Sequence, residues 1–202
     1  MSDEKSKYQP TVVTGTVRLS YPNLIQPNDY QGKKRWGATG IIENLDSDES
    51  KKTLADLAAV VDKATMIKWG KKASDVAKFE SPIKDGKDKE DKDGYGAGTR
   101  YFRAYSEFCS PPSGITFYNP DMTVVDPMEA EQRFYAGCYV RMILTAYDWS
   151  HYEEGNLVKQ GVSFSPVKIQ FVKDGQGFRP QADPEAEFEA LAEAPKGDDD
   201  FG

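Results

Sequence analysis

Histidine and cysteine are scarce in this sequence, which has one histidine and two cysteines in 202 residues. A structural zinc site takes four cysteine or histidine ligands, often with a C-x-x-C pair, and the chain offers only His151, Cys109 and Cys138. Both cysteines lie in apolar, strand-like surroundings, where free cysteine is commonly buried. We therefore expect ordinary core thiols, no disulfide, no bound metal and no cofactor.

Long hydrophobic runs are also absent. The longest uncharged stretch, residues 108–120, has 13 residues and three prolines, whereas a membrane-spanning helix needs about 18 apolar residues. Residues 1–10 contain no apolar segment of the kind that forms the centre of a signal peptide. The sequence therefore predicts a soluble cytoplasmic protein that is not bound to a membrane.

Catalytic motifs are missing as well. The chain has no G-x-S-x-G sequence, and the Gly-Lys pairs at residues 32–33 and 86–87 lack the first glycine of a phosphate-binding loop. Asp121, Asp126 and Glu129 could form a carboxylate site, but their spacing selects no metal and no mechanism. We expect no enzymatic activity, with a metal-dependent nuclease or hydrolase at Asp121–Glu129 as the alternative.

The acidic excess is confined to the C-terminal end. The net charge is -7, yet residues 1–180 hold 25 acidic and 25 basic residues, and residues 181–202 hold eight acidic and one basic. The segment 181–202 is rich in Pro, Ala and Glu, so we expect it to be disordered. Near its end, three consecutive acidic residues precede an aromatic ring: Asp198, Asp199, Asp200 and Phe201. This pattern favours a segment that mimics nucleic acid and binds protein partners over a segment that only keeps the protein soluble.

A second polar stretch, residues 81–98, alternates lysine with acidic residues and then becomes rich in glycine. It is no EF-hand, because placing Gly94 at the invariant sixth position puts Lys89 and Arg100 where acidic ligands are required. We interpret residues 81–98 as a mobile loop within one domain of residues 11–180, preceded by a flexible N-terminus of residues 1–10.

Most of that domain has the pattern of β-strands. One helix is predicted over residues 48–69, where apolar residues recur at helical spacing, and a helical turn over 127–135. These elements favour a small β-barrel, closed or partly open, with an inserted helix and long loops; a β-sandwich is the competing architecture. The expected strands cover residues 11–21, 34–43, 100–108, 114–118, 138–149 and 161–172.

Aromatic and basic residues alternate along several of these strands. Side chains two positions apart share a face, and in residues 100–108 and 138–149 one face is apolar while the other mixes rings with guanidinium groups. Residues of the first, second and last strands extend the pattern. The candidate nucleic-acid-binding residues are Arg18, Lys34, Trp36, Tyr101, Arg103, Tyr105, Tyr139, Arg141, Tyr147, Trp149 and Lys168.

Such a surface suits a single-stranded nucleic acid. Bases stack on aromatic rings whatever their sequence, and basic groups follow the phosphates. Strands also favour aromatic residues for packing, and arginine keeps an exposed face soluble. The combination on three strands favours a binding face over these alternatives.

Three segments resemble the single-stranded DNA-binding proteins of tailed bacteriophages: RLSYPNL (18–24), YAGCYVRMILTAYD (135–148) and GVSFSPVKIQFVKDGQ (161–176). The resemblance implies an oligonucleotide/oligosaccharide-binding (OB) fold of five strands. It also implies a role in coating single-stranded DNA during replication, recombination and repair in the host cell cytoplasm. Acidic tails of this family bind replication or recombination proteins and restrain the DNA groove.

We therefore predict a sequence-independent single-stranded DNA-binding protein whose acidic tail recruits partners and occupies the groove when DNA is absent. A homo-oligomer is possible, since an exposed edge strand or the tail could join two copies. A protein-interaction module with a solubilising tail is the main alternative. An RNA-binding protein would use the same physical interactions.

Overall fold

The computed structural model describes residues 9–108 and 114–178 of the chain. Within these ranges no helix is long and apolar enough to cross a membrane. The helices are α1 (Asp48–Trp69) and α2 (Pro127–Arg133), with short 3-10 helices η1 (Ala73–Asp75) and η2 (Gly86–Lys89). The strands are β1 (Thr11–Val13), β2 (Val17–Tyr30), β3 (Lys33–Ile42), β4 (Phe79–Glu80), β5 (Ile83–Asp85), β6 (Arg100–Ser106), β7 (Thr116–Tyr118), β8 (Tyr139–Glu153) and β9 (Asn156–Lys173).

Five of these strands pair in a closed circuit. β2 pairs with β3 and β8, β3 with β6, and β8 with β9, all antiparallel. β6 and β9 run parallel and meet at a single register pair, Ala104 and Phe164, which closes the circuit. β1 pairs with β8, β5 with β6, and both β4 and β7 with β9. The predicted mainly β architecture with one main helix is confirmed.

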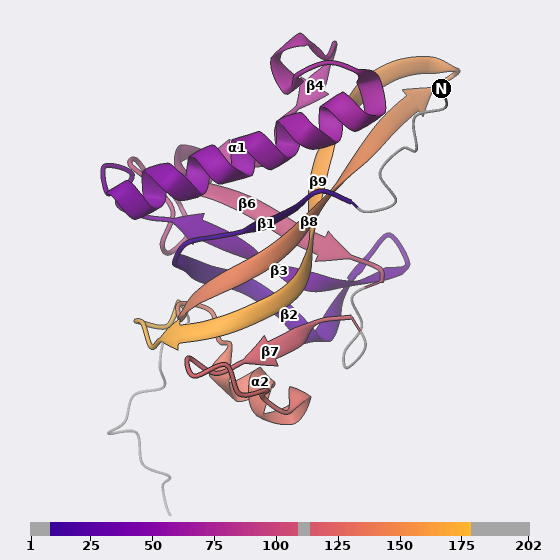
Figure 1. Cartoon of the computed structure of the whole chain (residues 1–202). Coiled ribbons are helices and arrows are strands. Elements are labelled where there is room, and N and C mark those ends of the chain that lie inside the picture. Colours follow the sequence, from indigo (N-terminus) through magenta and orange to yellow (C-terminus); the bar gives the residue numbers. More distant parts are fainter. Residues whose placement is uncertain (1–8, 109–113, 179–202) are drawn as a thin grey trace, which may run out of the picture.

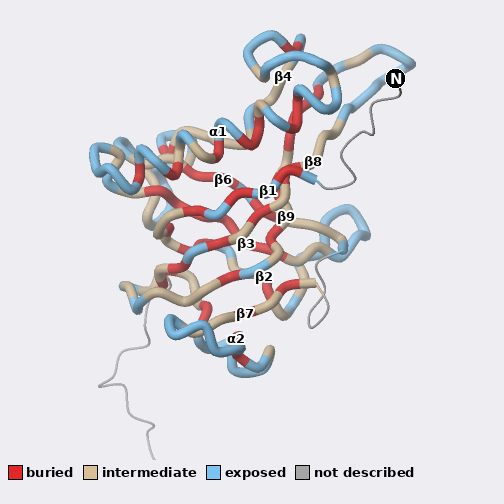
Figure 2. Tube along the Cα trace, viewed as in Figure 1, coloured by how far each residue is buried: buried red, intermediate tan, exposed pale blue. Residues whose placement is uncertain are grey.

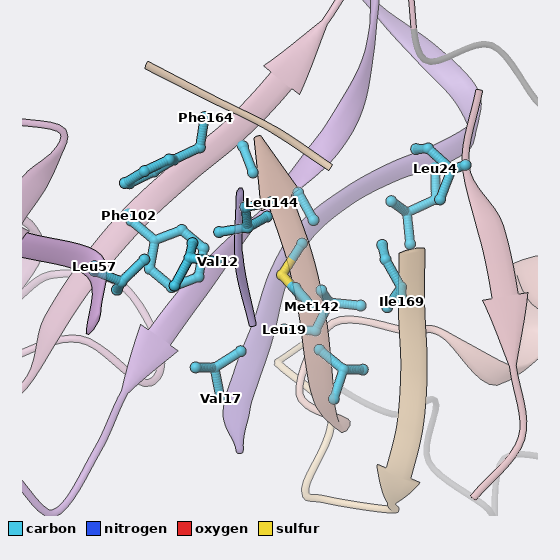
Figure 3. Packing of buried hydrophobic residues seen from close by; sticks show 14 of the residues in the cluster. Val12, Val17, Leu19, Leu24, Leu57, Phe102, Met142, Leu144, Phe164 and Ile169 are labelled. Carbon is cyan, nitrogen blue, oxygen red and sulfur yellow. The ribbon is translucent and has the colours of Figure 1, made fainter. Parts of the chain in front are cut away.

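The core forms where the apolar faces of the circuit strands meet (Figure 3). The six core residues named below are fully buried, and burying one such side chain stabilises the fold by about 1.5–3 kcal/mol. Alternate residues supply it, as expected for strands with one buried face. Prominent core residues are Leu19, Phe102, Met142, Leu144, Phe164 and Ile169.

Helix α1 begins and ends where the sequence predicted. The Ser47 side chain accepts a hydrogen bond from the Ser50 amide, which caps the first turn. Gly70 adopts the left-handed conformation (φ 66°) that ends many helices. Leu57 and Val61 on one face are buried against the sheet. α1 lies along one end of the sheet and α2 along the opposite end (Figure 1).

The N-terminal strand differs from the prediction. The chain leaves β1 at Thr14, and β2 then continues to Tyr30 instead of ending at Pro22. Tyr21 has a φ of 46° and the register with β3 shifts between Ser20 and Asn23, so the Tyr-Pro-Asn sequence is a bulge within one strand. The predicted end of the strand at residue 21 is therefore wrong, because the bulge absorbs Pro22 without ending the pairing.

The long β8–β9 hairpin is buried at its base and exposed at its tip (Figure 2). Cys138, immediately before β8, is buried and free, and burial raises the pKa of its thiol to about 12. It therefore has the surroundings expected of a core thiol, while Cys109 falls outside the described residues. The segment expected as the loop 81–98 contains β5 and η2, which fold against β6.

Candidate nucleic-acid interface

The outer face of β6 carries Tyr101, Arg103 and Tyr105. Their cross-strand neighbours on β3 are Ile41, Thr39 and Gly37, so these pairs share one side of the sheet. The intervening Phe102 and Ala104 are fully buried in the core. The alternation that the sequence predicted for this strand is therefore present.

A cavity of about 650 Å³ opens over this face, and we call it the tyrosine groove. Four tyrosines and three basic side chains line it. No carboxylate belongs to the lining within the described chain. The groove residues are Tyr21, Asn23, Asn28, Tyr30, Arg35, Thr39, Lys89, Arg103, Tyr105, Tyr147, Ser163 and Phe164.

Hydrogen bonds fix the rings on the groove floor. The Tyr105 hydroxyl donates to the carbonyl oxygen of Tyr21 at 2.6 Å, and the Tyr147 hydroxyl donates to the carbonyl oxygen of Tyr105 at 3.2 Å. Burial raises the pKa of Tyr105, so its hydroxyl stays protonated at neutral pH. Both rings are therefore held in place before any ligand arrives.

A second cavity of about 420 Å³, the tryptophan cavity, shares Arg103 and Ser163 with the groove. Trp149 lies over Gly161 of the neighbouring strand, where an added Cβ would sit 3.0 Å from the indole ring. Unlike the groove, this cavity includes acidic side chains. Its lining is Glu80, Ser81, Pro82, Lys84, Asp88, Tyr101, Arg103, Trp149, Val162 and Ser163.

Five of the predicted binding residues thus come together in two adjoining cavities: Tyr101, Arg103, Tyr105, Tyr147 and Trp149. They come from β6 and β8, and β9 lies between these strands in the circuit. Arg103 belongs to both linings, so the tyrosine groove and the tryptophan cavity adjoin at this residue.

Lys34 and Trp36 do not share that face. Trp36 is paired with Ser106, packs against the core and donates its indole N–H to the carbonyl oxygen of Ile25 at 3.3 Å. The even-numbered positions of β3 therefore face the core side, and Arg35 points into the groove instead. The predicted outward face of this strand is wrong by one residue.

Arg18 and Tyr139 lie at another site, where they hold the segment after β9. The Arg18 guanidinium pairs with Glu43 at 3.1 Å and stands 4.4 Å from the centre of the Phe178 ring. The Tyr139 hydroxyl donates to the same Glu43 carboxylate at 3.0 Å. Their side chains are engaged within the protein rather than in the tyrosine groove.

Arg141 and Lys168 are also remote from the groove. Arg141 lines a separate cavity between β1 and α1, where its guanidinium donates to the carbonyl oxygen of Thr14 at 3.4 Å. The Lys168 ammonium group lies 5.7 Å from the centre of the Tyr118 ring on β7. The tail residues Asp198, Asp199, Asp200 and Phe201 lie outside the described residues.

Two tyrosines and two basic residues of the groove escaped the sequence analysis: Tyr21, Tyr30, Arg35 and Lys89. Tyr21 stood at the end of a predicted strand, Tyr30 stood between two predicted strands, and Lys89 stood in the predicted polar loop. Gln31 and Gly32, both with positive φ, form a two-residue turn. Extending the predicted strand as far as this turn would have placed Tyr21 and Tyr30 within it.

The carboxylates of the alternative enzymatic site have other contacts. The Asp121 side chain accepts hydrogen bonds from the Thr123 amide at 3.0 Å and hydroxyl at 2.6 Å, and these bonds lower the pKa of the carboxyl. Asp126 caps α2 by accepting a hydrogen bond from the Met128 amide at 2.8 Å. Across residues 9–108 and 114–178, no three His, Cys, Asp or Glu residues are grouped to hold a metal.

Solved structures of phage proteins share this fold. The single-stranded DNA-binding protein from bacteriophage Enc34, in complex with ssDNA, aligns with a TM-score of 0.65 and 18% identity over 84% of this chain and 90% of that one. gp2.5, a single-stranded DNA-binding protein encoded by bacteriophage T7, aligns with a TM-score of 0.58 and 8% identity over 91% of this chain and 100% of that one.

Comparison with curated protein sequences gave no match. The family model of the ssDNA-binding protein of Enterobacter phage Enc34 matches residues 10–201, nearly the full sequence. The resemblance noted in the sequence is confirmed, and the chain belongs to this phage ssDNA-binding protein family.

Proposed function

We propose that this protein binds single-stranded DNA without sequence preference, through the tyrosine groove and the adjoining tryptophan cavity. The observation that carries the proposal is the groove lining, with four tyrosines, three cations and no carboxylate among its described residues. Each base can stack on a ring, an interaction of about 1–3 kcal/mol, and the cations can neutralise phosphates. None of these contacts requires a particular base.

The strand circuit supports a more specific proposal for the fold. Five strands that close through a parallel pair are compatible with an OB-type barrel, in which the face of the second and third strands binds oligonucleotides. Counted from β2, those strands are β3 and β6, and the tyrosine groove opens over them. Family membership and the Enc34 complex with ssDNA agree with this proposal.

The acidic segment 181–202 extends the proposal to regulation. With eight acidic residues and one basic, it resembles nucleic acid in charge, and we infer that it competes for the groove until DNA displaces it. Once displaced, Asp198, Asp199, Asp200 and Phe201 would recruit proteins of phage DNA replication or recombination. The protein itself would protect the strand and carry out no chemistry.

Fluorescence anisotropy of a labelled oligo(dT) tests DNA binding at about 50 and 200 mM salt. We expect salt-sensitive binding by the full chain, and weaker binding of an oligo(U) of equal length. Arg103→Gln should weaken binding and lower the slope of log K against log salt by about 0.7, the value for one phosphate contact. Arg141→Gln is the matched control, because Arg141 lines the separate cavity between β1 and α1.

No binding by the full chain at either salt concentration would contradict the proposal and leave a protein-interaction module as the better account. Equal losses in Arg103→Gln and Arg141→Gln would contradict the assignment of the groove. Tighter binding of oligo(U) would make RNA the preferred ligand.

A further inference from the structure

Lys89, in the 3-10 helix η2, is surrounded by aromatic rings at the edge of the tyrosine groove. Its ammonium nitrogen lies 4.9 Å from the ring centre of Tyr21, 5.1 Å from that of Tyr95 and 5.0 Å from that of Tyr101. The three rings come from β2, from the segment after η2 and from β6. An ammonium group within about 6 Å of a ring is attracted to its face, so this cage holds the lysine from three sides.

The cage is built on rigid supports. Tyr95 and Tyr101 pack edge to face with ring centres 5.2 Å apart, and burial raises the pKa of Tyr95 to about 12. The base of the segment is closed by the Gly86 amide, which donates to the carbonyl oxygen of Thr99 at 3.0 Å. The two ends of this segment can approach this closely because Gly86 has no side chain: an added Cβ there would overlap the Thr99 side chain.

The caged ammonium group has no ion-pair partner within the described part of the chain. Burial lowers the pKa of Lys89, the positive charge of Arg103 lowers it further, and Asp91 acts in the opposite direction. Lys89 and Arg103 both line the groove, whose described lining contains no carboxylate. Two neighbouring cations therefore face this cavity without a close ion pair in the described part of the chain, although Asp91 acts on Lys89 and Asp88 lines the tryptophan cavity with Arg103.

We propose that Lys89 and Arg103 together form a site for a backbone phosphate at this end of the groove, and that Tyr21, Tyr95 and Tyr101 position the lysine. The site rests on the proposed function and refines it. Tyr101 is only 5% exposed, and Lys89 lies against its ring, so Tyr101 acts as a positioning residue and not as a stacking platform. Base stacking then falls to Tyr105, Tyr147 and Trp149.

The test compares full-length variants by oligo(dT) anisotropy across a salt series. Lys89→Met keeps an unbranched side chain of nearly the same length and removes its charge. It should weaken binding about tenfold at low salt, as expected for loss of one charged hydrogen bond, and lower the salt slope by about 0.7. Lys89→Arg should retain both, since a guanidinium group also stacks on rings. Lys87→Met, at an exposed position outside the groove lining, should leave both unchanged.

A double-mutant cycle separates positioning from stacking. If Tyr101 only positions the lysine, Tyr101→Leu should weaken wild-type binding but have no further effect in the Lys89→Met background. Circular dichroism and thermal melting verify that each variant folds. Additive losses would assign Tyr101 to base stacking and overturn its positioning role.

Lys89→Met with unchanged affinity and slope would overturn the phosphate site while leaving the proposed function intact. Tighter binding by Lys89→Met would also overturn it, because the lysine would then occupy the place of a base. Failure of the wild-type chain to bind at any salt concentration would remove the proposed function and this site together.

Discussion

At the scale of single residues, Trp36 and Trp149 illustrate how position decides the role of a side chain. The Trp36 indole is hydrogen-bonded to Ile25 and packs against the core. The Trp149 ring packs against Gly161 and lines the tryptophan cavity with Arg103. Of these two rings, Trp149 is the one that lines the proposed binding surface.

Replacing Trp149 by Ala should therefore weaken oligo(dT) binding about 5- to 150-fold, the range that corresponds to the 1–3 kcal/mol of one base–aromatic stack. Trp149→Phe should recover most of the loss because it retains a ring. Trp36→Phe is the control: it should lower the melting temperature without changing affinity. An affinity loss restricted to one base composition would contradict a stacking role for Trp149.

The sequence predicted the groove residues of β6 and β8 because their apolar and polar positions alternate without ambiguity. On β3, Lys33, Lys34 and Arg35 place cations on both faces, so Trp36 alone decided the assignment, and a tryptophan can face either the core or solvent. Lys89 carries no periodic signal, since only the tertiary fold brings Tyr21 and Tyr101 to it.

At the scale of elements, the close approach of β3 and β6 shapes the groove. Gly37 has a φ of 149°, and an added Cβ would overlap the carbonyl oxygen of Ala104 on β6. A side chain there would separate the two strands next to Tyr105, the cross-strand neighbour of Gly37. The glycine is thus required for the pairing that forms the groove floor.

Gly37→Ala should consequently lower the free energy of unfolding by about 3 kcal/mol or more, through both backbone strain and overlap. Gly32→Ala is the matched control, because Gly32 also has a positive φ (76°) but has nothing within 4 Å of the added Cβ. The Gly32→Ala variant should lower the free energy of unfolding by only about 1–2 kcal/mol. Urea denaturation measures both, and equal losses would show that the contact with Ala104 is unimportant.

Elements with local signals were predictable and those without were not. The serine cap, the αL glycine and the apolar face of α1 all lie within or directly beside the helix in sequence, so a local pattern was enough to predict it. The extent of β2 depends instead on β3, which pairs with it on both sides of the bulge at Tyr21 and Pro22. The sequence showed a break there because the residues that maintain the strand lie on its partner.

At the scale of the whole molecule, charge is divided between a neutral body and an acidic end. Residues 1–180 contain equal numbers of acidic and basic residues, so the net charge of -7 comes from residues 181–202. Global composition argues against nucleic-acid binding, whereas the groove lining argues for it.

The order of strands in the circuit could not be predicted from the sequence, because paired residues such as Ala104 and Phe164 are distant in the chain.

Deleting residues 181–202 should accordingly tighten oligo(dT) binding at low salt, because a competing polyanion is removed. The gain should shrink as salt rises and screens the competition. A second variant, with Asp198, Asp199 and Asp200 changed to Asn, should reproduce part of the gain in a chain of full length. Anisotropy titrations measure both, and unchanged affinity in both variants would contradict competition by the tail.

The junction of β6 and β9 has a consequence for the size of base that the protein can accept. One register pair joins these strands, and the Tyr147 hydroxyl reaches across to the Tyr105 carbonyl oxygen near it. Separating the two strands here would break this side-chain hydrogen bond but no ladder of backbone hydrogen bonds. If the tyrosine groove binds bases as proposed, we expect it to accept a purine or a smaller pyrimidine at similar cost, because little backbone pairing has to change at this junction.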